Sequence, residues 1–586
     1  MRIKKAGIAL AAATALVLSA CSGSADDAET TEGGTTEGTS SEGEGEGEGA
    51  SAQLALSDYN KVDPAELQQG GDLRLAISSM PVNYNGMQKD GNTVDTSTIW
   101  GFMSPINWIF DETGAWDVNP NFVESYDVND APEGEAAMVV TLKLNPEAKW
   151  YDGTPITVAD YQATWDACND AEDAFLCAST DGWILIDSIE AGADEFEVVV
   201  SFNTPYPDWS ANLSGVYPAA GVSDAETFNT GWIEPNVDTL NNYVSGPYKF
   251  GSIDTGAQRI SLVPNENWWG SEPKLSTVTF SVLDTAARAQ AFANNELDAL
   301  EMITDAATYE LVQTRPDAEL YMSGSQQWRH LTFNSRAEVL SELEVRQAIQ
   351  KGIDQLDFVS TDLAGLPSAE YDMRLGNHFF MPGQDGYQDN SVEFDPEGAR
   401  EQLESIGFTE GADGFYERDG AVLEFDFLRI PGTPASESAA SLLTEHMADI
   451  GVKVNVVDVP SEEFFDYVIG GEYEVTSFAW NGTPYPMANV GQIYGKPFNA
   501  EGQLTNSNFA GLEVPEIDEY VTRIAGETDP EARKALTNEV DQIIWEQVMV
   551  VPLYFRANIT AVPANLANYG ATNFETFLPE NIGYTN

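Results

Sequence analysis

The local structure of the chain is clearest in the segment Leu142-Lys-Leu-Asn-Pro-Glu-Ala-Lys-Trp-Tyr-Asp-Gly-Thr-Pro-Ile-Thr-Val-Ala-Asp-Tyr-Gln-Ala-Thr-Trp165. Residues 139–144 are rich in β-branched and aliphatic side chains, which predicts a short strand leading into this segment. Asp152-Gly153 is a turn pair. Thr157 stands three residues before Asp160, a spacing typical of a capping box, and this predicts a helix that continues through Trp165. Strand, turn and capped helix alone indicate no function.

Six residues of this segment have the spacing of a known signature: Trp150, Asp152, Gly153, Pro155, Thr157 and Asp160. On these residues the chain resembles the family-5 extracytoplasmic solute-binding proteins, the oligopeptide, dipeptide and nickel receptors of bacterial ABC importers. Two further segments resemble this family in the same order. Ser245-Gly-Pro-Tyr-Lys-Phe250 is similar to the family's return to its first domain, and residues 394–408 are similar to a helix of its second lobe.

The resemblance implies an α/β fold of the two-lobed periplasmic-binding-protein (Venus flytrap) type, with three subdomains and mixed sheets. The first lobe is expected to comprise residues 67–96, 245–327 and 553–586. Residues 97–244 are expected to form an inserted, mostly β subdomain of that lobe, and residues 328–552 the second lobe. The ligand is expected in the cleft between the two lobes.

Within the expected second lobe, residues 422–429 and 452–457 have the composition of strands, and residues 436–450 have the spacing of an amphipathic helix. A strand–helix–strand succession of this kind predicts two parallel strands joined by a crossover helix.

Candidate ligand-binding residues follow from the resemblance: Ser79, Pro81, Trp100, Trp328, Ala479, Trp480, Asn481, Thr483 and Tyr485. The backbone of residues 479–481, at the end of an expected strand, could pair with an extended peptide, with Trp480 as one wall. For Trp100 the alternative is a place in the hydrophobic core.

The charged anchors of the peptide receptors are not found at their usual positions. Those receptors carry an aspartate three residues after the tryptophan that binds the peptide α-ammonium, and Thr483 stands at that position here. The dipeptide receptors also hold the ligand carboxylate with an arginine, and the ungapped position here is Ile430. Arg429 is one residue earlier, which turns its side chain to the other face of a strand, so a surface or interdomain arginine is the alternative.

The N-terminus has the pattern of an export signal. Residues 1–5 contain three basic side chains, and residues 6–18 form an apolar core too short to span a bilayer. Leu18-Ser-Ala-Cys21 then resembles a lipobox, with small residues before a cysteine that becomes the lipid-modified N-terminus. The alternative is an ordinary signal peptide with a chance cysteine. We expect residues 1–20 to be removed, and Cys21 to anchor the protein on the extracytoplasmic face of the cell membrane.

A long acidic segment follows this cysteine. Residues 22–50 contain nine acidic side chains, eight glycines and no lysine or arginine. Such a segment buries too little apolar surface to fold, so residues 21–66 are predicted to form a disordered tether.

The acidity extends over the whole chain. The first 50 residues carry three basic and nine acidic side chains, so −62 of the formal net charge of −68 lies on the remaining residues. A field of this sign repels nucleic acid, and we expect no nucleic-acid partner.

Cys168 and Cys177 are the other cysteines of the chain, and in an exported protein two cysteines this close are predicted to form a disulfide. A metal site is not expected, because His330, His378 and His446 are far apart in the sequence and none has ligand spacing to a cysteine. No motif indicates a cofactor.

Enzyme activity is not expected either, because the chain has no Gly-x-Ser-x-Gly elbow and no phosphate-binding loop. The sequence predicts a monomeric receptor that delivers an oligopeptide-like ligand to the permease and ATPase subunits of an ABC importer. The alternatives are a receptor for an oligosaccharide, a chelate or a modified peptide, a secreted hydrolase, and a structural surface lipoprotein.

Overall fold

The computed structural model describes residues 54–130, 136–169, 174–233, 236–461, 463–500 and 502–586. The predicted signal peptide, the predicted lipid-bearing Cys21 and the tether up to residue 53 lie outside these described residues. Among the helices of the described part, none has the length and the apolar character needed to cross a membrane.

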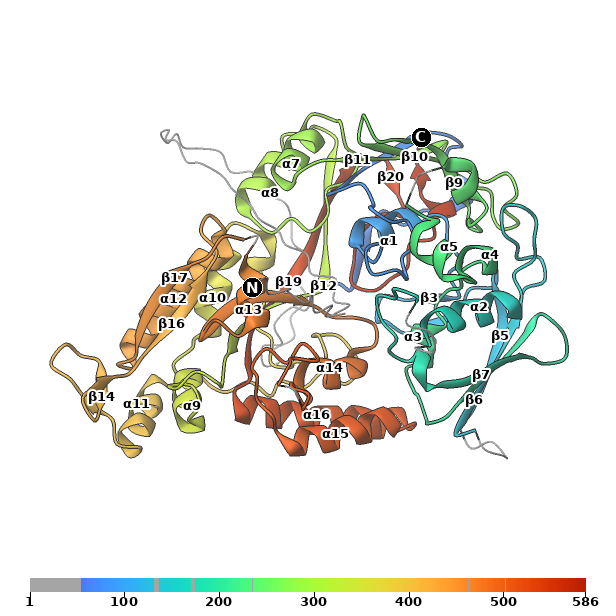
Figure 1. The fold of residues 1–586 in the computed structure, drawn as a ribbon. Coiled ribbons are helices and arrows are strands. Elements are labelled where there is room, and N and C mark those ends of the chain that lie inside the picture. The colour runs from blue at the N-terminus through green and yellow to red at the C-terminus, as the bar shows by residue number, and fades with distance from the viewer. Residues whose placement is uncertain (1–53, 131–135, 170–173, 234–235, 462, 501) are drawn as a thin grey trace, which may run out of the picture.

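The chain folds into two lobes that are joined by two long antiparallel strands, β12 (Ala318–Phe333) and β19 (Val550–Pro563) (Figure 1). Their register is irregular between Gly324 and Trp328, near the middle of β12. The predicted two-lobed α/β architecture with mixed sheets is confirmed. The expected boundaries at residues 327/328 and 552/553 fall inside these two strands, so the lobes share them.

The first lobe is built on a four-stranded sheet in the order β2 (Asp72–Ile77), β11 (Thr277–Val282), β10 (Arg259–Pro264) and β9 (Tyr248–Asp254). Strands β2 and β11 are parallel, and the other pairs are antiparallel. Alternate residues Leu73, Leu75 and Ile77 are buried, as the period of a strand requires when one face meets the core. The helices of this part are α1 (Val94–Trp100), α7 (Thr285–Ala293) and α8 (Ala306–Val312).

The inserted subdomain carries an antiparallel sheet in the order β5 (Val123–Asn129), β6 (Met138–Leu144), β8 (Glu197–Phe202) and β7 (Ile186–Ala191). It also contains the hairpin β3 (Trp108–Phe110) and β4 (Trp116–Val118). Its helices are α2 (Val158–Cys168), α3 (Trp209–Asn212), α4 (Ala219–Val222), α5 (Ala225–Thr230) and α6 (Val237–Asn241).

The signature segment is held together by one buried carboxylate. The Thr157 hydroxyl and the Asp160 side chain form a capping box at the start of α2, as predicted. Asp160 also accepts hydrogen bonds from the indole N–H of Trp150 at 3.2 Å and from the backbone N–H of Ala219 at 2.9 Å. Burial raises the pKa of Asp160, while these hydrogen bonds lower it. The spacing of the signature therefore fixes the strand-to-helix turn.

The second lobe contains a five-stranded mixed sheet in the order β17 (Lys453–Asp458), β16 (Glu424–Arg429), β18 (Val475–Asn481), β12 and β19. The predicted parallel pair is confirmed, because β16 and β17 are parallel neighbours joined through helix α12 (Pro434–Asp449). Its remaining helices are α9 (Leu343–Lys351), α10 (Gln355–Asp362), α11 (Pro396–Ser405), α13 (Phe464–Gly470), α14 (Val490–Tyr494), α15 (Pro515–Gly526) and α16 (Pro530–Gln547).

The prediction that residues 21–66 form a disordered tether is wrong for the last residues of this range. Residues 57–59 form strand β1 (Ser57–Tyr59), which pairs antiparallel with β21 (Gly570–Thr572) at the other end of the chain. The Tyr59 hydroxyl donates to Glu575 at 2.7 Å, and its ring meets the edge of Phe577 at 5.0 Å. This segment is held in the fold by its strand pairing and by the aromatic side chain of Tyr59.

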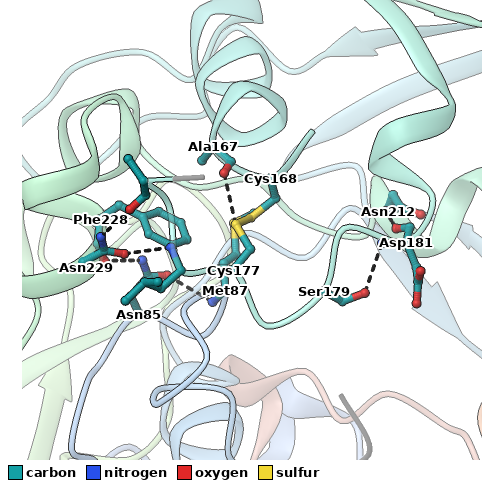
Figure 2. The surroundings of a disulfide bond; sticks show 12 residues. Asn85, Met87, Ala167, Cys168, Cys177, Ser179, Asp181, Asn212, Phe228 and Asn229 are labelled. Carbon is teal, nitrogen blue, oxygen red and sulfur yellow. Dashed lines mark hydrogen bonds between the residues drawn. A yellow bond between two sulfur atoms is a disulfide. The ribbon is translucent and has the colours of Figure 1, made fainter. Parts of the chain in front are cut away.

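The structure contains the Cys168–Cys177 disulfide, which lies at the end of α2 (Figure 2). Cys177 forms an antiparallel bridge with Gln88, and the neighbouring Ala178 N–H donates to the Met87 carbonyl at 2.8 Å. The disulfide therefore ties α2 of the inserted subdomain to a loop of the first lobe.

Replacing both cysteines by alanine should lower the free energy of unfolding by about 2–3 kcal/mol, because a disulfide that closes a short loop restricts the unfolded chain. Urea unfolding of the wild type and the double variant measures this difference. A reducing agent should lower the midpoint of the wild type but not that of the variant. Equal unfolding midpoints for the wild type and the double variant, both measured without reducing agent, would contradict the prediction.

Candidate functional site

A cavity of about 790 Å³ lies between the inserted subdomain and the second lobe. We call it the interlobe trough. Its lining from the subdomain includes Tyr206 and Asp208, and its lining from the second lobe includes Met487, Gln492 and Arg533. Since both lobes contribute to its walls, a change in their relative position changes the shape of this cavity.

A buried ion pair crosses the trough. Arg533, in the first turn of α16, donates from Nη1 to Oδ1 of Asp208 at 2.7 Å, and its Nη2 bonds the other carboxylate oxygen. The side chains of Arg533 and Asp208 are only 5% and 8% exposed. The Arg533 Nε–H also donates to the Ile524 carbonyl at 2.9 Å. Because each buried charge needs the other, the pair favours the arrangement in which the lobes touch.

The loop after β18 makes a second contact between the lobes. The Ser210 hydroxyl donates to the Tyr485 hydroxyl at 3.2 Å, and the Phe110 ring lies edge-on to the Tyr485 ring at 6.1 Å. Burial raises the pKa of Tyr485 to about 12, so the hydroxyl stays neutral at physiological pH. The Thr483 hydroxyl accepts the Tyr485 backbone N–H at 3.1 Å. Two of the sequence-predicted site residues therefore lie where the lobes meet.

A second cavity, of about 710 Å³, lies on the side of the first lobe and shares Ser179, Asp181 and Tyr206 with the trough. We call it the aromatic cavity, because its lining includes Trp100, Trp183, Tyr206, Tyr217, Trp232 and Tyr243. Trp100 was expected either at the ligand site or in the core, and in the structure it packs in the core while also lining this cavity. Its ring packs against Trp232 and Phe250, its N–H donates to the Tyr84 carbonyl at 2.7 Å, and one part lines this cavity.

A third cavity, of about 240 Å³, lies against one face of the mixed sheet of the second lobe, and the residues that precede α8 of the first lobe complete its wall. We call it the arginine pocket. Its lining includes Thr304, Asp305, Arg329, Asp362, Leu363, Ile430, Ala435, Ser436, Phe464, Phe465, Ser477, Ala479, Tyr554 and Arg556. In the register of the sheet, Arg329 of β12 lies between Ala479 of β18 and Tyr554 of β19, so these three side chains share the face toward the pocket.

The sequence-based inference missed both arginines of this pocket. Arg329 directly follows Trp328 in a strand whose last residues are all buried, and Arg556 follows Phe555 in the strand beside it. A charged residue inside a buried strand is the signal that could have identified them, because such a charge is retained only where a partner or ligand compensates its burial. Burial lowers the pKa of Arg329 from its ordinary value, and the nearby Arg556 lowers it further, while Tyr554 and Asp362 raise it.

Trp328 and Trp480 do not share this face. Trp480 is 4% exposed and stacks on Phe509, with ring centroids 5.9 Å apart and planes at 3°. Trp328 lies beside His330 at 5.1 Å, inside the same core. Side chains alternate along β18, so placing Ala479 toward the pocket turns Trp480 into the core. Trp480 therefore lines none of the three cavities, and its role as a wall of the ligand site stays a prediction.

The other predicted site residues are separated. The Ser79 N–H and hydroxyl donate to the Asp95 carboxylate at 2.9 and 3.1 Å in the exposed loop after β2, and Pro81 follows in that loop; neither residue lines the three cavities above. Asn481 is exposed at the end of β18, where its side-chain oxygen accepts from Gln327 at 3.4 Å.

Arg429 does not replace the missing family arginine. It pairs with Asp458 on the neighbouring strand, with Nε and Oδ1 2.7 Å apart, and both side chains are partly exposed. Arg429 is therefore a surface arginine, which was the alternative given for it. Ile430, the next residue, lines the arginine pocket.

Comparison with known proteins gives a consistent result. Residues 117–502 match the family described as bacterial extracellular solute-binding proteins, family 5 Middle. The chain is 34% identical over 528 residues to the oligopeptide-binding protein OppA of Mycobacterium tuberculosis strain H37Rv, covering 88% of this chain and 85% of that protein.

Solved structures share the fold. A periplasmic EDTA-binding protein EppA superposes with a TM-score of 0.80 at 21% identity, covering 91% of this chain and 99% of that one. The oligopeptide-binding protein AppA from Bacillus subtilis, in complex with a nonapeptide, has a TM-score of 0.68 at 19% identity, covering 89% and 100%.

Replacing Asp208 by asparagine should shift the protein toward a more open arrangement, because an unpaired buried arginine costs about 3–5 kcal/mol and opening returns Arg533 to water. Small-angle scattering should give a larger radius of gyration for the variant than for the wild type. The double variant Asp208→Asn/Arg533→Gln removes the unpaired charge and should return toward the wild-type radius.

The matched control is Asp298→Asn, which breaks the Arg74–Asp298 ion pair inside the first lobe. This control should leave the radius unchanged. If Asp208→Asn and the control give the same radius, the ion pair does not hold the lobes together.

Proposed function

This chain belongs to the bacterial extracellular solute-binding proteins of family 5, and from that premise we propose that it is the oligopeptide-binding receptor of an ABC importer. The observation that carries the proposal is the similarity to an oligopeptide-binding protein over 85% of that protein's length. The family membership and the two-lobed fold describe a binding protein and not an enzyme.

The cavities are consistent with a ligand longer than a dipeptide. The interlobe trough of about 790 Å³ and the adjoining aromatic cavity of about 710 Å³ each lie within the range of about 300–1,000 Å³ that is usual for one small-molecule site. The two cavities adjoin, since they share Ser179, Asp181 and Tyr206, and together they offer more room than a dipeptide needs. The tryptophan and tyrosine rings that line the aromatic cavity accept apolar peptide side chains of different shapes.

Thr483 stands at the position where the peptide receptors carry the aspartate that holds the ligand amine. A buried ammonium needs a charged or multiply accepting partner, and the Thr483 hydroxyl is a neutral group that already accepts the Tyr485 N–H. The receptor therefore prefers peptides held along their backbone, or ligands whose amine is blocked or absent, over short free dipeptides.

Calorimetry with matched free and N-acetylated peptides of two to nine residues tests this function. Longer peptides should bind more tightly than dipeptides, and acetylation should change the affinity little. Thr483→Asp should increase the affinity for the free amine but not for the acetylated peptide. A strong wild-type preference for the free amine would contradict the role given to Thr483, and the absence of binding by every peptide would contradict the peptide receptor.

We also propose that Cys21 carries the lipid anchor and that the acidic tract after it extends the receptor away from the membrane toward the permease. The support is the sequence Leu18-Ser-Ala-Cys21 after a basic and apolar leader. Membership of the family supports the further proposal that the receptor delivers its ligand to permease and ATPase subunits.

Cys21→Ala should leave the protein unprocessed or released, because the thiol is the acylation site and the acidic tract has no affinity for anionic lipid. Metabolic labelling with a fatty acid, followed by fractionation of expressing cells, measures the outcome. Cys168→Ala is the matched control, since it removes a different cysteine. A Cys21→Ala protein that still carries label in the membrane fraction would exclude this anchor.

A further inference from the structure

We propose that the arginine pocket binds a free carboxylate of the ligand next to an apolar group, with Arg329 and Arg556 as the binding residues. The proposal rests on the receptor function above and names the ligand chemistry that it selects. These arginines lie on β12 and β19, not at Ile430, where the dipeptide receptors carry their arginine.

Arg329 differs from the other buried arginines of the described residues, which are Arg315, Arg346 and Arg533. Arg315 and Arg533 pair with carboxylates. Arg346 donates to the backbone carbonyls of Leu340, Ser341 and Gln547. Arg329 is 7% exposed, and among these four side chains it alone keeps a buried nitrogen, Nε, without a hydrogen-bond partner. A missing acceptor for a buried cation indicates that a ligand supplies it.

The contacts that Arg329 does make orient it toward the cavity. Its Nη2 donates to the Ser477 hydroxyl at 2.8 Å and to the Ala435 carbonyl at 3.2 Å. Both acceptors are neutral, so they hold the guanidinium in place and no carboxylate bonds it directly. An incoming carboxylate can therefore form charge-assisted hydrogen bonds to a guanidinium whose orientation is already fixed.

Arg556 adds a second positive charge to the pocket. Its Nη1 donates to the side-chain oxygen of Gln327 at 2.6 Å, a neutral acceptor, and its backbone carbonyl accepts from Ser325 at 2.8 Å. Within the part of the chain that the structure describes, neither Arg329 nor Arg556 forms an ion pair, although acidic residues far outnumber basic ones in this protein.

The two acids of the lining are occupied by other donors. Asp362 accepts from the Tyr554 hydroxyl at 2.5 Å and from the Ser438 hydroxyl. Asp305 caps α8 by accepting the Thr308 N–H at 2.8 Å. Helix α12 begins at Pro434 on the rim of the pocket, and its 16 residues direct the positive end of the helix dipole toward the cavity. These hydrogen bonds occupy the two carboxylates and leave the guanidinium groups and the helix N-terminus available to a negative group.

The remaining lining is apolar. Leu363, Ile430, Phe464 and Phe465 lie around the same cavity, whose volume is about 240 Å³. A cavity of this size takes a carboxylate with one side chain beside it, and not a whole peptide. Either the C-terminal residue of a peptide or an acidic side chain with an apolar neighbour fits this description.

The test uses calorimetry with three forms of one acetylated pentapeptide that ends in phenylalanine: free C-terminus, C-terminal amide, and the amide with a glutamate before the phenylalanine. Amidation should weaken binding to the wild type by about tenfold or more, as expected when a hydrogen bond to a charged group is lost. Recovery with the glutamate form would assign the site to an acidic side chain, and no recovery would assign it to the C-terminal carboxylate.

Arg556→Gln and Arg329→Gln should weaken binding of the free-carboxylate form and remove the effect of amidation. The matched control is Arg429→Gln, which deletes the same charge from the same sheet but outside the pocket and should behave as the wild type. Melting curves check that each variant folds, and Arg556, which is less buried, keeps the test valid if Arg329→Gln does not fold.

N-acetyl-L-phenylalanine and its amide, tested by the same calorimetry, separate this proposal from the receptor function. Binding of the acid but not the amide, lost in Arg556→Gln, would support the pocket even if no peptide binds. Peptide binding that is unaffected by amidation and by both arginine variants would overturn the pocket and leave the peptide receptor standing. If neither peptides nor N-acetyl-L-phenylalanine bind, both are overturned.

Discussion

The pairing of β12 with β19 is the contact on which the rest of the structure depends. These strands run from one lobe into the other, and in the second lobe they complete the mixed sheet beside β18. The register breaks between Gly324 and Trp328, where the ladder passes from one lobe to the other. The register shifts again between Arg329 and His330, and a paired ribbon with such irregularities can bend there while both lobes keep their own hydrogen bonds. Arg329 and Arg556 lie next to this point, so the proposed carboxylate site is beside the part of the molecule that must move.

Two buried arginines of this acidic chain, Arg533 and Arg329, lie at its cavities. Arg533 reaches across the interlobe trough to Asp208, and breaking that pair would leave a charge in a dry environment. Arg329 is equally buried but lacks a carboxylate. Most surface ion pairs contribute little in comparison, because water screens them. In the proposed mechanism, closing of the lobes and selection of the ligand depend on a small number of buried cations, although the overall charge is strongly negative.

The sequence predicted the structure correctly where short-range patterns determine it or where the chain resembles a known family. The capping box at Thr157 and Asp160 and the parallel pair around α12 need only short-range patterns, and the order of motifs was sufficient for the two-lobed fold. Strand β1 was missed because its partner β21 lies more than 500 residues later. Trp480 and Ala479 were treated together as site residues, but adjacent strand residues face opposite sides, and the sequence does not say which side holds the cavity. Arg329 was missed because the sequence does not say which face of its strand holds a cavity.

Closure of the two lobes on a peptide is the central claim, and it is tested most directly by a distance measured between them. Spin labels at Glu190, exposed on β7 of the inserted subdomain, and at Glu519, exposed on α15 of the second lobe, report this distance by pulsed electron resonance. Saturation with the tightest-binding peptide from calorimetry should shorten the mean distance and narrow its distribution. An unchanged distribution at full saturation would contradict the claim that the ligand is held between moving lobes.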